Sequence, residues 1–389
     1  MWPGALHVFR WIILLAALAP FGYYVLAMIA ARRFFGRPPA LPRDFTPPVS
    51  ILKPIKGLDR EAYENYASFC SQDYPDYEVL FCVPDDSDPA IPVLQKVIAE
   101  HPHCRARLLI GAEELGTSKK VNKLVRLVRE ARHDFFVISD SDIRVAPDYL
   151  RSVVAHFSDS RVAAVTCLYR GLTDGSLPSV LEALGNSSDF AAGVLCAWLL
   201  GGVDFTLGAT MATRRERLAE IGGFEALANH LTDDYELGQR LHARGYRVAL
   251  ADFPVCTVFP AQSLRQVFAH QVRWTMTLRV AEPWGHLGLI FAQGLPWAIL
   301  AAAVAPRIWI ATAYLAAYVA LRFAMAWTVG ARGLRDPLLR RKMYLLPLRD
   351  AFAFVVYVVS FFKRRIVWRD AEYYVRDRRL VPAAPRAPH

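Results

Sequence analysis

The chain has 389 residues, 54% of them hydrophobic, and its mean hydropathy is +0.21. Both values are high for a soluble protein, so membrane-spanning segments are the first feature to look for. The net charge of +10 is typical of positive flanks around membrane helices, and it also suits contact with anionic headgroups or a pyrophosphate. Because zinc-finger spacing, an RNP-like pattern and a basic region with heptads are all missing from the sequence, we expect no nucleic-acid partner.

The six cysteines include no C-x-x-C pair, and several of them lie in apolar runs. Apolar surroundings favour buried free thiols, which persist in a reducing compartment. We therefore expect neither disulfides nor a metal site built from cysteine.

The N-terminal apolar run, Trp11 to Ala31, contains no charge and has the length of one bilayer crossing. A cleaved signal peptide would have a shorter apolar core, so the run indicates an uncleaved membrane anchor. Only Arg10 flanks it on one side, whereas Arg32, Arg33 and Arg37 follow on the other. The positive-inside rule then predicts an inner-membrane protein whose chain enters the cytoplasm after this anchor.

The C-terminal third contains further apolar runs that are candidate membrane spans. His286 to Val304 and Ile308 to Val329 are candidate spans. The shorter run Ala351 to Phe362 is either a third span, if Tyr344 to Leu348 is included, or a re-entrant segment. The Pro/Ala-rich tail from Val381 is expected to be disordered.

Between these regions, residues 48–280 alternate strand-like and helix-like patterns, which predicts an α/β domain with a mostly parallel sheet. Ligands of such sheets bind at the carboxyl ends of the strands. One apolar run inside the domain, Phe190 to Val203, is short for a crossing and reads either as a buried core helix or as an interfacial helix beside a lipid site. The expected strands are Val49–Leu52, Tyr77–Val83, Arg107–Ile110, Phe135–Ser139 and Val162–Leu168, and the expected helices are Glu61–Gln72, Lys119–Arg132 and Pro147–Phe157.

The most specific motif is Ser139-Asp140-Ser141-Asp142, which follows the apolar strand Phe135–Ser139. Alternate residues of an extended chain point the same way, so the two carboxylates face one spot beyond the strand end. A hard divalent cation such as Mg²⁺ or Mn²⁺ takes such oxygen ligands together with phosphate oxygens. Asp140 and Asp142 are therefore candidate metal ligands, and an ordinary acidic turn is the alternative.

Two further motifs suit a nucleotide. Asp85 and Asp88 lie in Pro84-Asp85-Asp86-Ser87-Asp88, directly after a predicted strand, where a carboxylate can accept hydrogen bonds from a uracil ring or a ribose. A solvated Asp/Pro turn is the alternative. Lys120 follows a Gly-Thr-Ser turn and can contact phosphates, although exposed lysines at helix starts are common.

Two motifs suit catalysis. Asp234, in Thr232-Asp233-Asp234-Tyr235-Glu236, opens a predicted helix and is a candidate general base, or else only a partner of the helix dipole. His270, Arg273 and Trp274 share one face of another predicted helix. Arg273 can hold a pyrophosphate and Trp274 can wall an acceptor site, or the two can be interfacial membrane residues.

Taken in order, these motifs resemble the D, D, D, (Q/R)xxRW signature of ceramide glucosyltransferases, glycosyltransferase family 21, and of their processive relatives. The resemblance extends to Lys53-Pro54-Ile55-Lys56-Gly57, Ser71-Gln72-Asp73-Tyr74-Pro75 and Gly222-Gly223-Phe224. It implies a GT-A nucleotide-sugar-binding domain over residues 48–280, with an anchor and linker at 1–47, a membrane region at 281–380 and a tail at 381–389. The segments Thr166–Gly171 and Gly208–Met211 look more like a bacterial branch that transfers N-acetylglucosamine to bacteriohopanetetrol.

Carried over by position, the resemblance implies that Asp85 contacts the nucleoside, Asp140 lies near the metal-bound diphosphate and Asp234 is the base. Arg273 and Trp274 would close the motif. Asp142 stands where animal ceramide enzymes have glycine, so its role as a ligand rests on the Asp-x-Asp pattern alone. His270 replaces Gln or Arg of the signature, which leaves its role open.

The implied activity is inverting transfer of N-acetylglucosamine or glucose from a UDP-sugar to a lipid hydroxyl. Our preferred acceptor is bacteriohopanetetrol, and ceramide is the alternative. A processive polysaccharide synthase would share the motifs, but three or four candidate spans are few for a translocation channel. A non-catalytic scaffold is disfavoured because every motif position is filled.

Overall fold

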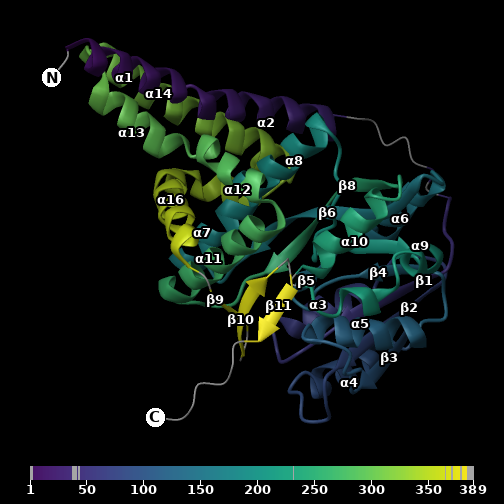
Figure 1. The fold of residues 1–389 in the computed structure, drawn as a ribbon. Coiled ribbons are helices and arrows are strands. Elements are labelled where there is room, and N and C mark those ends of the chain that lie inside the picture. Colours follow the sequence, from purple (N-terminus) through teal and green to yellow (C-terminus); the bar gives the residue numbers. More distant parts are fainter. Residues whose placement is uncertain are drawn as a thin grey trace, which may run out of the picture. The chain divides into compact units, whose positions relative to one another are not determined.

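The computed structural model describes residues 3–36, 42, 44–230, 232–363, 365–368, 371–376 and 379–382. The chain divides into two compact units, each assembled from separate segments (Figure 1). The membrane unit comprises Met1–Arg37, Gly175–Leu200 and Gln262–Lys363. The sheet unit comprises Pro38–Asp174, Gly201–Ala261 and Arg364–His389.

The sheet unit is built on an eight-stranded sheet with the order β3-β2-β1-β4-β7-β6-β8-β5. Strands β1 to β4 are parallel neighbours, and β6 is parallel to β8, whereas β7 and β5 run antiparallel to their partners. This confirms the mostly parallel sheet predicted from the alternating pattern. The strands are β1 (Val49–Pro54), β2 (Tyr77–Val83), β3 (Arg105–Ile110), β4 (Phe135–Ile138), β5 (Ile143–Arg144), β6 (Val162–Leu172), β7 (Met211–Arg214) and β8 (Arg247–Val258).

Helices pack on this sheet where the sequence showed a period of 3.6 residues. Helix α5 lies against β1 and β2, and α10 lies against β6 and β8. The apolar face of α5 is buried at Val121, Leu124, Val125 and Leu127. The helices are α3 (Ala62–Cys70), α4 (Ile91–Glu100), α5 (Lys119–Glu130), α6 (Tyr149–Val154), α9 (Arg215–Glu220) and α10 (Asp233–His242), with 3-10 turns η1 (Ala155–Ser158) and η3 (Phe224–Leu227).

A second, antiparallel sheet has the order β11-β10-β9. Its strands are β9 (Arg365–Trp368), β10 (Ala371–Arg376) and β11 (Arg379–Pro382). Of the tail expected to be disordered from Val381, the first two residues end β11, and 383–389 lie outside the described residues. All six cysteines are free thiols, and Cys256 is the least buried of them.

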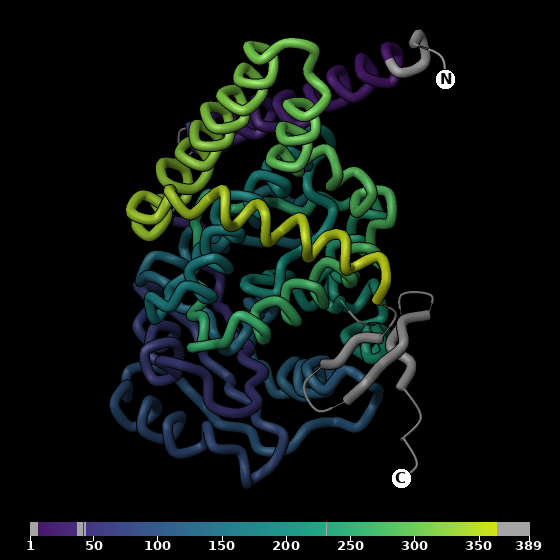
Figure 2. Tube along the Cα trace, turned by 90° about the vertical axis from the view of Figure 1, so that its left-hand side faces the viewer, coloured from purple at the N-terminus to yellow at the C-terminus, as the bar shows by residue number. Residues whose placement is uncertain are grey.

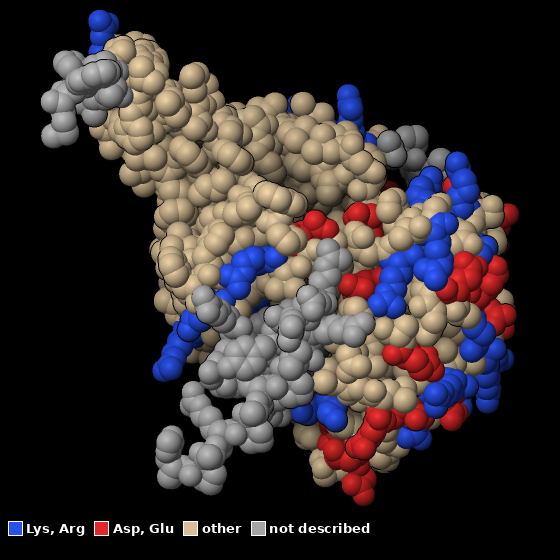
Figure 3. Space-filling model, viewed as in Figure 1, with Lys and Arg blue, Asp and Glu red and all other residues tan. Residues whose placement is uncertain are grey.

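The membrane unit is helical throughout the residues that the structure describes. Figure 2 shows α13 and α14, in bright green, as the two arms of a helical hairpin. Figure 3 shows few charged side chains over this hairpin and α1, as expected for helices that face lipid. The helices are α1 (Pro3–Ala16), α2 (Ala19–Phe35), α7 (Leu177–Gly185), α8 (Ala191–Leu200), α11 (Leu264–Ala281), α12 (Pro283–Gly288), α13 (Gly294–Val304), α14 (Ile308–Ala326), α15 (Pro337–Lys342) and α16 (Leu346–Phe362), joined in places by the π-helices η2 (Asn186–Phe190) and η5 (Trp327–Gly333) and by the 3-10 turns η4 (Leu289–Ala292) and η6 (Met343–Leu345).

Four described helices are long and apolar enough to cross a membrane: His7–Phe35, Leu177–Leu200, Ile308–Gly333 and Pro337–Phe362. The predicted anchor Trp11 to Ala31 falls within the first. The predicted run Phe190 to Val203 covers only part of the observed helix, because α7, η2 and α8 continue as one helix from Leu177 to Leu200. Polar residues at 186–189 interrupt the apolar pattern without ending the helix. Ser188 Oγ donates to the Leu184 carbonyl, and Asp189 Oδ1 accepts from Arg322 inside the same unit.

The predicted span His286 to Val304 is broken. Pro283–Ala292 and Gly294–Val304 meet at a bend of 53°, so they form either one broken span or a re-entrant loop. Pro296 explains the restart, since proline has no N–H to donate to the preceding turn and fits the first turn of a new helix. The C-terminal run does include Tyr344 to Leu348, within the candidate span Pro337–Phe362.

Candidate active site

The carboxyl end of β4 carries the predicted Asp-x-Asp pair. Strand β4 runs parallel to β1, with Ile138 opposite Leu52, and both residues are buried. Parallel strands end at one edge of a sheet, where this class of fold opens to ligands. Asp140 and Asp142 therefore emerge at the ligand-binding edge of the sheet unit.

A buried lysine, Lys53, makes hydrogen bonds to the loop that carries Asp140 and Asp142. Lys53, near the end of β1, donates from Nζ to the Asp140 backbone carbonyl at 2.5 Å, and Ser139 Oγ lies 3.5 Å from the same atom. Burial lowers the pKa of Lys53 to about 7, against the opposing effect of the Asp142 and Asp140 carboxylates. Lys53 thus fixes the backbone of the loop through its contact with the Asp140 carbonyl.

Lys120 joins two carboxylates that are far apart in the sequence. Its Nζ lies 2.9 Å from Asp140 Oδ1 and 3.0 Å from Asp233 Oδ2. The carboxylates raise its pKa above the usual lysine value in spite of burial, so the side chain is charged. Ser118 caps the helix that carries Lys120, and its N–H donates to the Ala228 carbonyl at 2.9 Å, which fixes where α5 begins.

Gly208 brings the candidate base next to the Asp-x-Asp motif. Its N–H donates to Asp234 Oδ2 at 2.9 Å, and its carbonyl accepts from the Asp140 N–H at 3.2 Å. A Cβ at this position would lie 2.5 Å from Asp140 Oδ2 and 3.4 Å from Asp234 Oδ2. Both oxygens therefore lie around one point, and only glycine leaves that point free.

The Asp234 carboxylate is held in position by two backbone N–H groups. Oδ1 accepts from the Tyr235 N–H at 2.8 Å, and Oδ2 accepts from the Gly208 N–H at 2.9 Å. Burial, followed by the charge of Asp233, raises its pKa to about 6, and Lys120 limits the rise. A carboxylate with this pKa is mostly ionised at neutral pH and more basic than an ordinary aspartate.

Asp142 belongs to a group of three carboxylates. Burial, then Asp140 and Asp59, raise its pKa to about 7. Asp59 accepts a hydrogen bond from Ser141 Oγ at 2.5 Å, so it is tied to the same loop. The Lys53 ammonium opposes this rise in the pKa of Asp142 but does not prevent it.

The two aspartates after β2 differ in their surroundings. Asp85 is exposed and accepts from the Ser87 N–H and hydroxyl, which lowers its pKa. Asp88 is buried, with Oδ2 accepting from the Gly57 N–H and Oδ1 from the Ala90 N–H, both at 2.9 Å. Both lie at the ligand edge, on the far side of β1 from Asp140. Asp85 is open to a ligand, while Asp88 fastens the loop after β1 to the start of α4.

The motif His270-Gln271-Val272-Arg273-Trp274 lies on α11, in the membrane unit. His270 Nδ1 is 2.6 Å from Glu182 Oε1, and Gln271 Nε2 donates to the same oxygen at 3.0 Å. Trp274 is 44% exposed and makes ring contacts with His270 and Phe190. The sequence left the role of His270 open, and in the structure His270 pairs with Glu182, a buried residue of α7 in the same unit.

Sequence reasoning gave no role to Lys53, Gly208, Asp59, Asp233 or Glu182. Only Lys53 left a local signal, as a charged residue in a strand of otherwise mostly apolar residues. Gly208 and Asp59 matter through contacts with residues distant in the sequence. Those contacts depend on the tertiary fold, so a single sequence could not reveal them.

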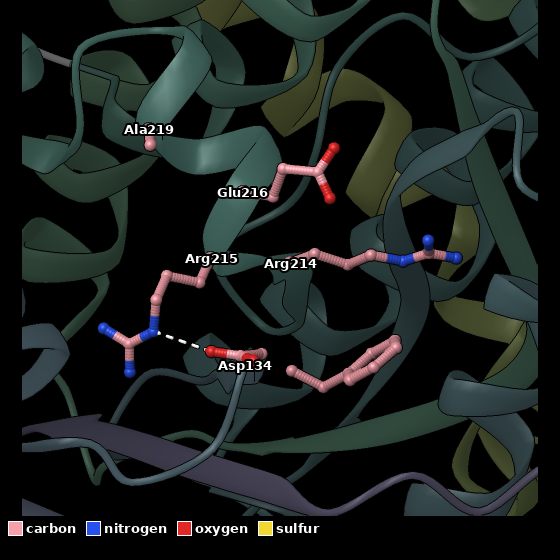
Figure 4. A pocket seen from close by; sticks show the side chains of 6 residues that line it. Asp134, Arg214, Arg215, Glu216 and Ala219 are labelled. Atoms are coloured by element: carbon pink, nitrogen blue, oxygen red, sulfur yellow. Dashed lines mark hydrogen bonds and ion pairs between the residues drawn. The ribbon is translucent and has the colours of Figure 1, made fainter.

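A pocket of about 540 Å³ lies at the opposite end of β4 from Asp140 (Figure 4). There Asp134 pairs with Arg215 at 3.0 Å, and the Arg214 guanidinium lies over the Phe135 ring. Because it opens at the amino end of the strand, it is separate from the acidic edge. Its lining residues are Asp134, Phe135, Arg214, Arg215, Glu216 and Ala219.

The sequence matches the family described as Glycosyl transferase family 21 over residues 12–381, almost the whole chain. The chain belongs to glycosyltransferase family 21. Ceramide glucosyltransferase 1 of Caenorhabditis elegans is 30% identical over 236 residues, 60% of this chain and 50% of that protein. A ceramide glucosyltransferase of Gibberella zeae is 35% identical over 156 residues, 38% of this chain and 29% of that protein. The match thus spans half or less of each of these two relatives.

The fold of this family 21 member is GT-A. A mannosyltransferase from Pyrobaculum calidifontis, solved in complex with GDP-Man and Mn²⁺, superposes with a TM-score of 0.54 at 20% identity. The superposition covers 91% of this chain and 99% of the other. It confirms the predicted GT-A fold class.

The acidic edge of this family 21 chain fits a divalent cation that is bound largely through phosphate oxygens. Among the described residues no group of three or more His, Cys, Asp or Glu side chains is arranged to hold a metal. Mg²⁺ and Mn²⁺ commonly take only one or two carboxylates together with substrate phosphates. The Asp140 and Asp142 carboxylates, which repel each other electrostatically beyond the end of β4, suit that arrangement.

Proposed function

We propose that the chain transfers a hexose from a nucleoside diphosphate sugar to a hydroxyl group of a membrane lipid, with ceramide as the acceptor that the relatives favour. The convergence of Asp140, Lys120 and Asp234 around Gly208 carries this proposal. It gathers a diphosphate-binding group, a cation and a base at the edge where GT-A sheets bind ligands. The curated family 21 relatives are named ceramide glucosyltransferases, which supports ceramide over bacteriohopanetetrol.

The donor diphosphate would lie against Asp140 and Asp142, with Lys120 supplying positive charge. When Mg²⁺ or Mn²⁺ is bound there, it neutralises the charge that develops on the leaving diphosphate. Asp85, exposed in the loop after β2, would accept hydrogen bonds from the nucleoside. Asp88 holds the neighbouring loop in position through its two backbone contacts.

Asp234 would accept the proton of the acceptor hydroxyl. The hydroxyl oxygen forms a bond to the anomeric carbon while the bond from that carbon to the diphosphate oxygen breaks. Attack from the face opposite the leaving group inverts the configuration, so an α-linked donor gives a β-linked product. The Gly208 and Tyr235 N–H groups orient the carboxylate without using all of its lone pairs.

Arg273 would add positive charge to the reaction, and Trp274 would provide an apolar wall for the acceptor. Glu182 acts on the motif indirectly, as a positioning residue, through His270 and Gln271. We place the reaction on the cytoplasmic face of the inner membrane, because Arg32 and Arg33 lie at the C-terminal end of the first candidate span.

The test uses full-length protein in lipid nanodiscs with UDP-glucose or UDP-N-acetylglucosamine and with ceramide or bacteriohopanetetrol. Mass spectrometry of the products would reveal a single hexose on one lipid. Asp234→Asn should lower kcat by about 10²- to 10⁴-fold, in the range of general-base catalysis. A polysaccharide product, or near wild-type kcat in a folded Asp234→Asn variant, would refute the proposal.

A further inference from the structure

Three candidate spans of the membrane unit meet at a buried ionic cluster. Arg322 of α14, only 1% exposed, donates to the Asp350 carboxylate of α16 at 2.8–3.1 Å. It also donates to Asp189 Oδ1 of η2 at 2.6 Å. Arg349 Nη2 lies 3.5 Å from Asp189 Oδ2. The cluster thus holds two positive and two negative charges on Leu177–Leu200, Ile308–Gly333 and Pro337–Phe362.

In a purely structural cluster, we would expect every charged side chain to be buried and every polar atom to have a hydrogen-bond partner. This cluster departs from that expectation in both respects. The side chain of Asp189 is 35% exposed, whereas that of Asp350 is 9% exposed. Arg349 Nε and Nη1 and Arg322 Nη1 are buried and have no hydrogen-bond acceptor among the described residues. Ionisable groups inside apolar helices are costly, and such exceptions mark sites for polar ligands.

The backbone around Asp189 is also shaped for this cluster. Asp189 lies on the π-helix η2, which packs against the π-helix η5. Single π-helical turns are frequent at functional sites, because they redirect side chains within a helix. A Cβ on Gly185 would collide with the Arg349 guanidinium, so glycine makes the space in which that side chain lies.

Residues next to the ionic cluster contact the motif His270–Trp274 on α11. Phe190, the residue after Asp189, makes a ring contact with Trp274 at 6.2 Å between centroids. Earlier on the same helix, Glu182 holds His270 and Gln271. One helix therefore carries the exposed carboxylate and also contacts the Trp of the family motif.

We propose that Asp189 and Arg349 bind the polar head of the lipid acceptor. The inference rests on the proposed function and names the part of the membrane unit that selects the lipid. The Asp189 carboxylate accepts a hydrogen bond from a hydroxyl of the head, and the Arg349 N–H groups donate to a second oxygen on the same lipid. Because the cluster is already neutral in charge, it suits an uncharged head better than a phosphate. Ceramide and bacteriohopanetetrol both provide neighbouring donor and acceptor groups.

Asp189→Asn and Asp350→Asn form a matched pair of variants. Each removes one negative charge from the same cluster and leaves Arg322 with one carboxylate, but only Asp189 is exposed. Full-length protein in nanodiscs would be assayed for the KM of each lipid, the KM of the donor sugar and the Tm. Loss of a hydrogen bond to a charged group should raise the acceptor KM about tenfold or more in Asp189→Asn. The donor KM should stay unchanged, and Asp350→Asn should lower the Tm without raising the acceptor KM.

Direct binding separates this inference from the proposed reaction. Short-chain fluorescent ceramide and, by competition, bacteriohopanetetrol would be titrated onto the nanodiscs without donor sugar. Weaker binding to Asp189→Asn than to Asp350→Asn supports the site even if no transfer occurs. Equal binding to the two variants, or no lipid binding by the wild type, overturns it.

Discussion

Gly208→Ala is the sharpest test of the candidate active site, because it adds one methyl group between the two central carboxylates. Gly208 does not lie in the left-handed region of backbone space, so alanine is permitted there by conformation. The new Cβ would stand 2.5 Å from Asp140 Oδ2, whereas real Cβ contacts begin near 3.0 Å. The Asp140 carboxylate must therefore move by at least about 0.5 Å.

A displacement of that size matters more for catalysis than for folding. Misplacing a reacting group by about 1 Å can cost roughly 10²-fold in rate, so we expect kcat to fall about 10- to 100-fold. The folded state should lose only about 1–3 kcal/mol through overpacking, since the crowded atom is the end of a side chain. The assay is single-hexose transfer in nanodiscs, with Tm measured on the same samples.

Gly201→Ala is the matched control. A Cβ at Gly201 meets nothing within 4 Å, and its backbone is likewise outside the left-handed region. This variant should keep wild-type kcat and Tm. If Gly208→Ala also keeps kcat within twofold of wild type, the carboxylate geometry around Gly208 does not determine the rate and the reasoning fails.

Four further outcomes are expected. Transfer by the wild type should rise as pH passes through about 6, because the Asp234 carboxyl must lose its proton to act as a base. Lys120→Met should move this rise to higher pH, because Lys120 lowers the pKa of Asp234. Asp88→Asn should lower the Tm, since an amide cannot accept from both the Gly57 and Ala90 N–H groups, at a cost of about 1–3 kcal/mol. Chelation of divalent cations should abolish transfer, and Mn²⁺ or Mg²⁺ should restore it.

The two variants have matched controls. Lys119→Met removes a neighbouring exposed charge and should leave the pH profile in place. Asp86→Asn changes an exposed aspartate of the same loop and should leave the Tm unchanged. A flat profile from pH 5 to 7, or full activity after exhaustive chelation, would contradict the roles given to Asp234 and to the acidic edge.

Much of the sheet unit could be predicted because its local patterns and its tertiary structure agree. Tyr77–Val83 was predicted to the residue, since an apolar β-rich run ends there at proline. The Asp-x-Asp motif was located because a short apolar strand leads directly to it. The predicted ends of strands were wrong where tertiary packing determines the length of the strand. Strand β6, for example, continues to Leu172, four residues past the predicted end.

The membrane unit was harder to predict. Hydropathy alone began the apolar run at Phe190, after Ser187, Ser188 and Asp189, because it counts every polar residue against burial. In the fold Ser188 Oγ and Asp189 Oδ1 both accept from Arg322, and the helix continues through them. Arg322 lies more than a hundred residues away, and the sequence alone does not reveal this partner.

The interleaving of the two units has a consequence for how this chain is made and handled. Strand β6 is synthesised before Gly175–Leu200, and its sheet partners β7 and β8 are synthesised after it. The sheet can therefore close only once the ribosome has delivered an apolar helix between its halves, so insertion into the bilayer and completion of the enzyme core are successive steps of one process. It also follows that no single cut yields a water-soluble catalytic fragment, and a soluble version would need a designed linker in place of Gly175–Leu200.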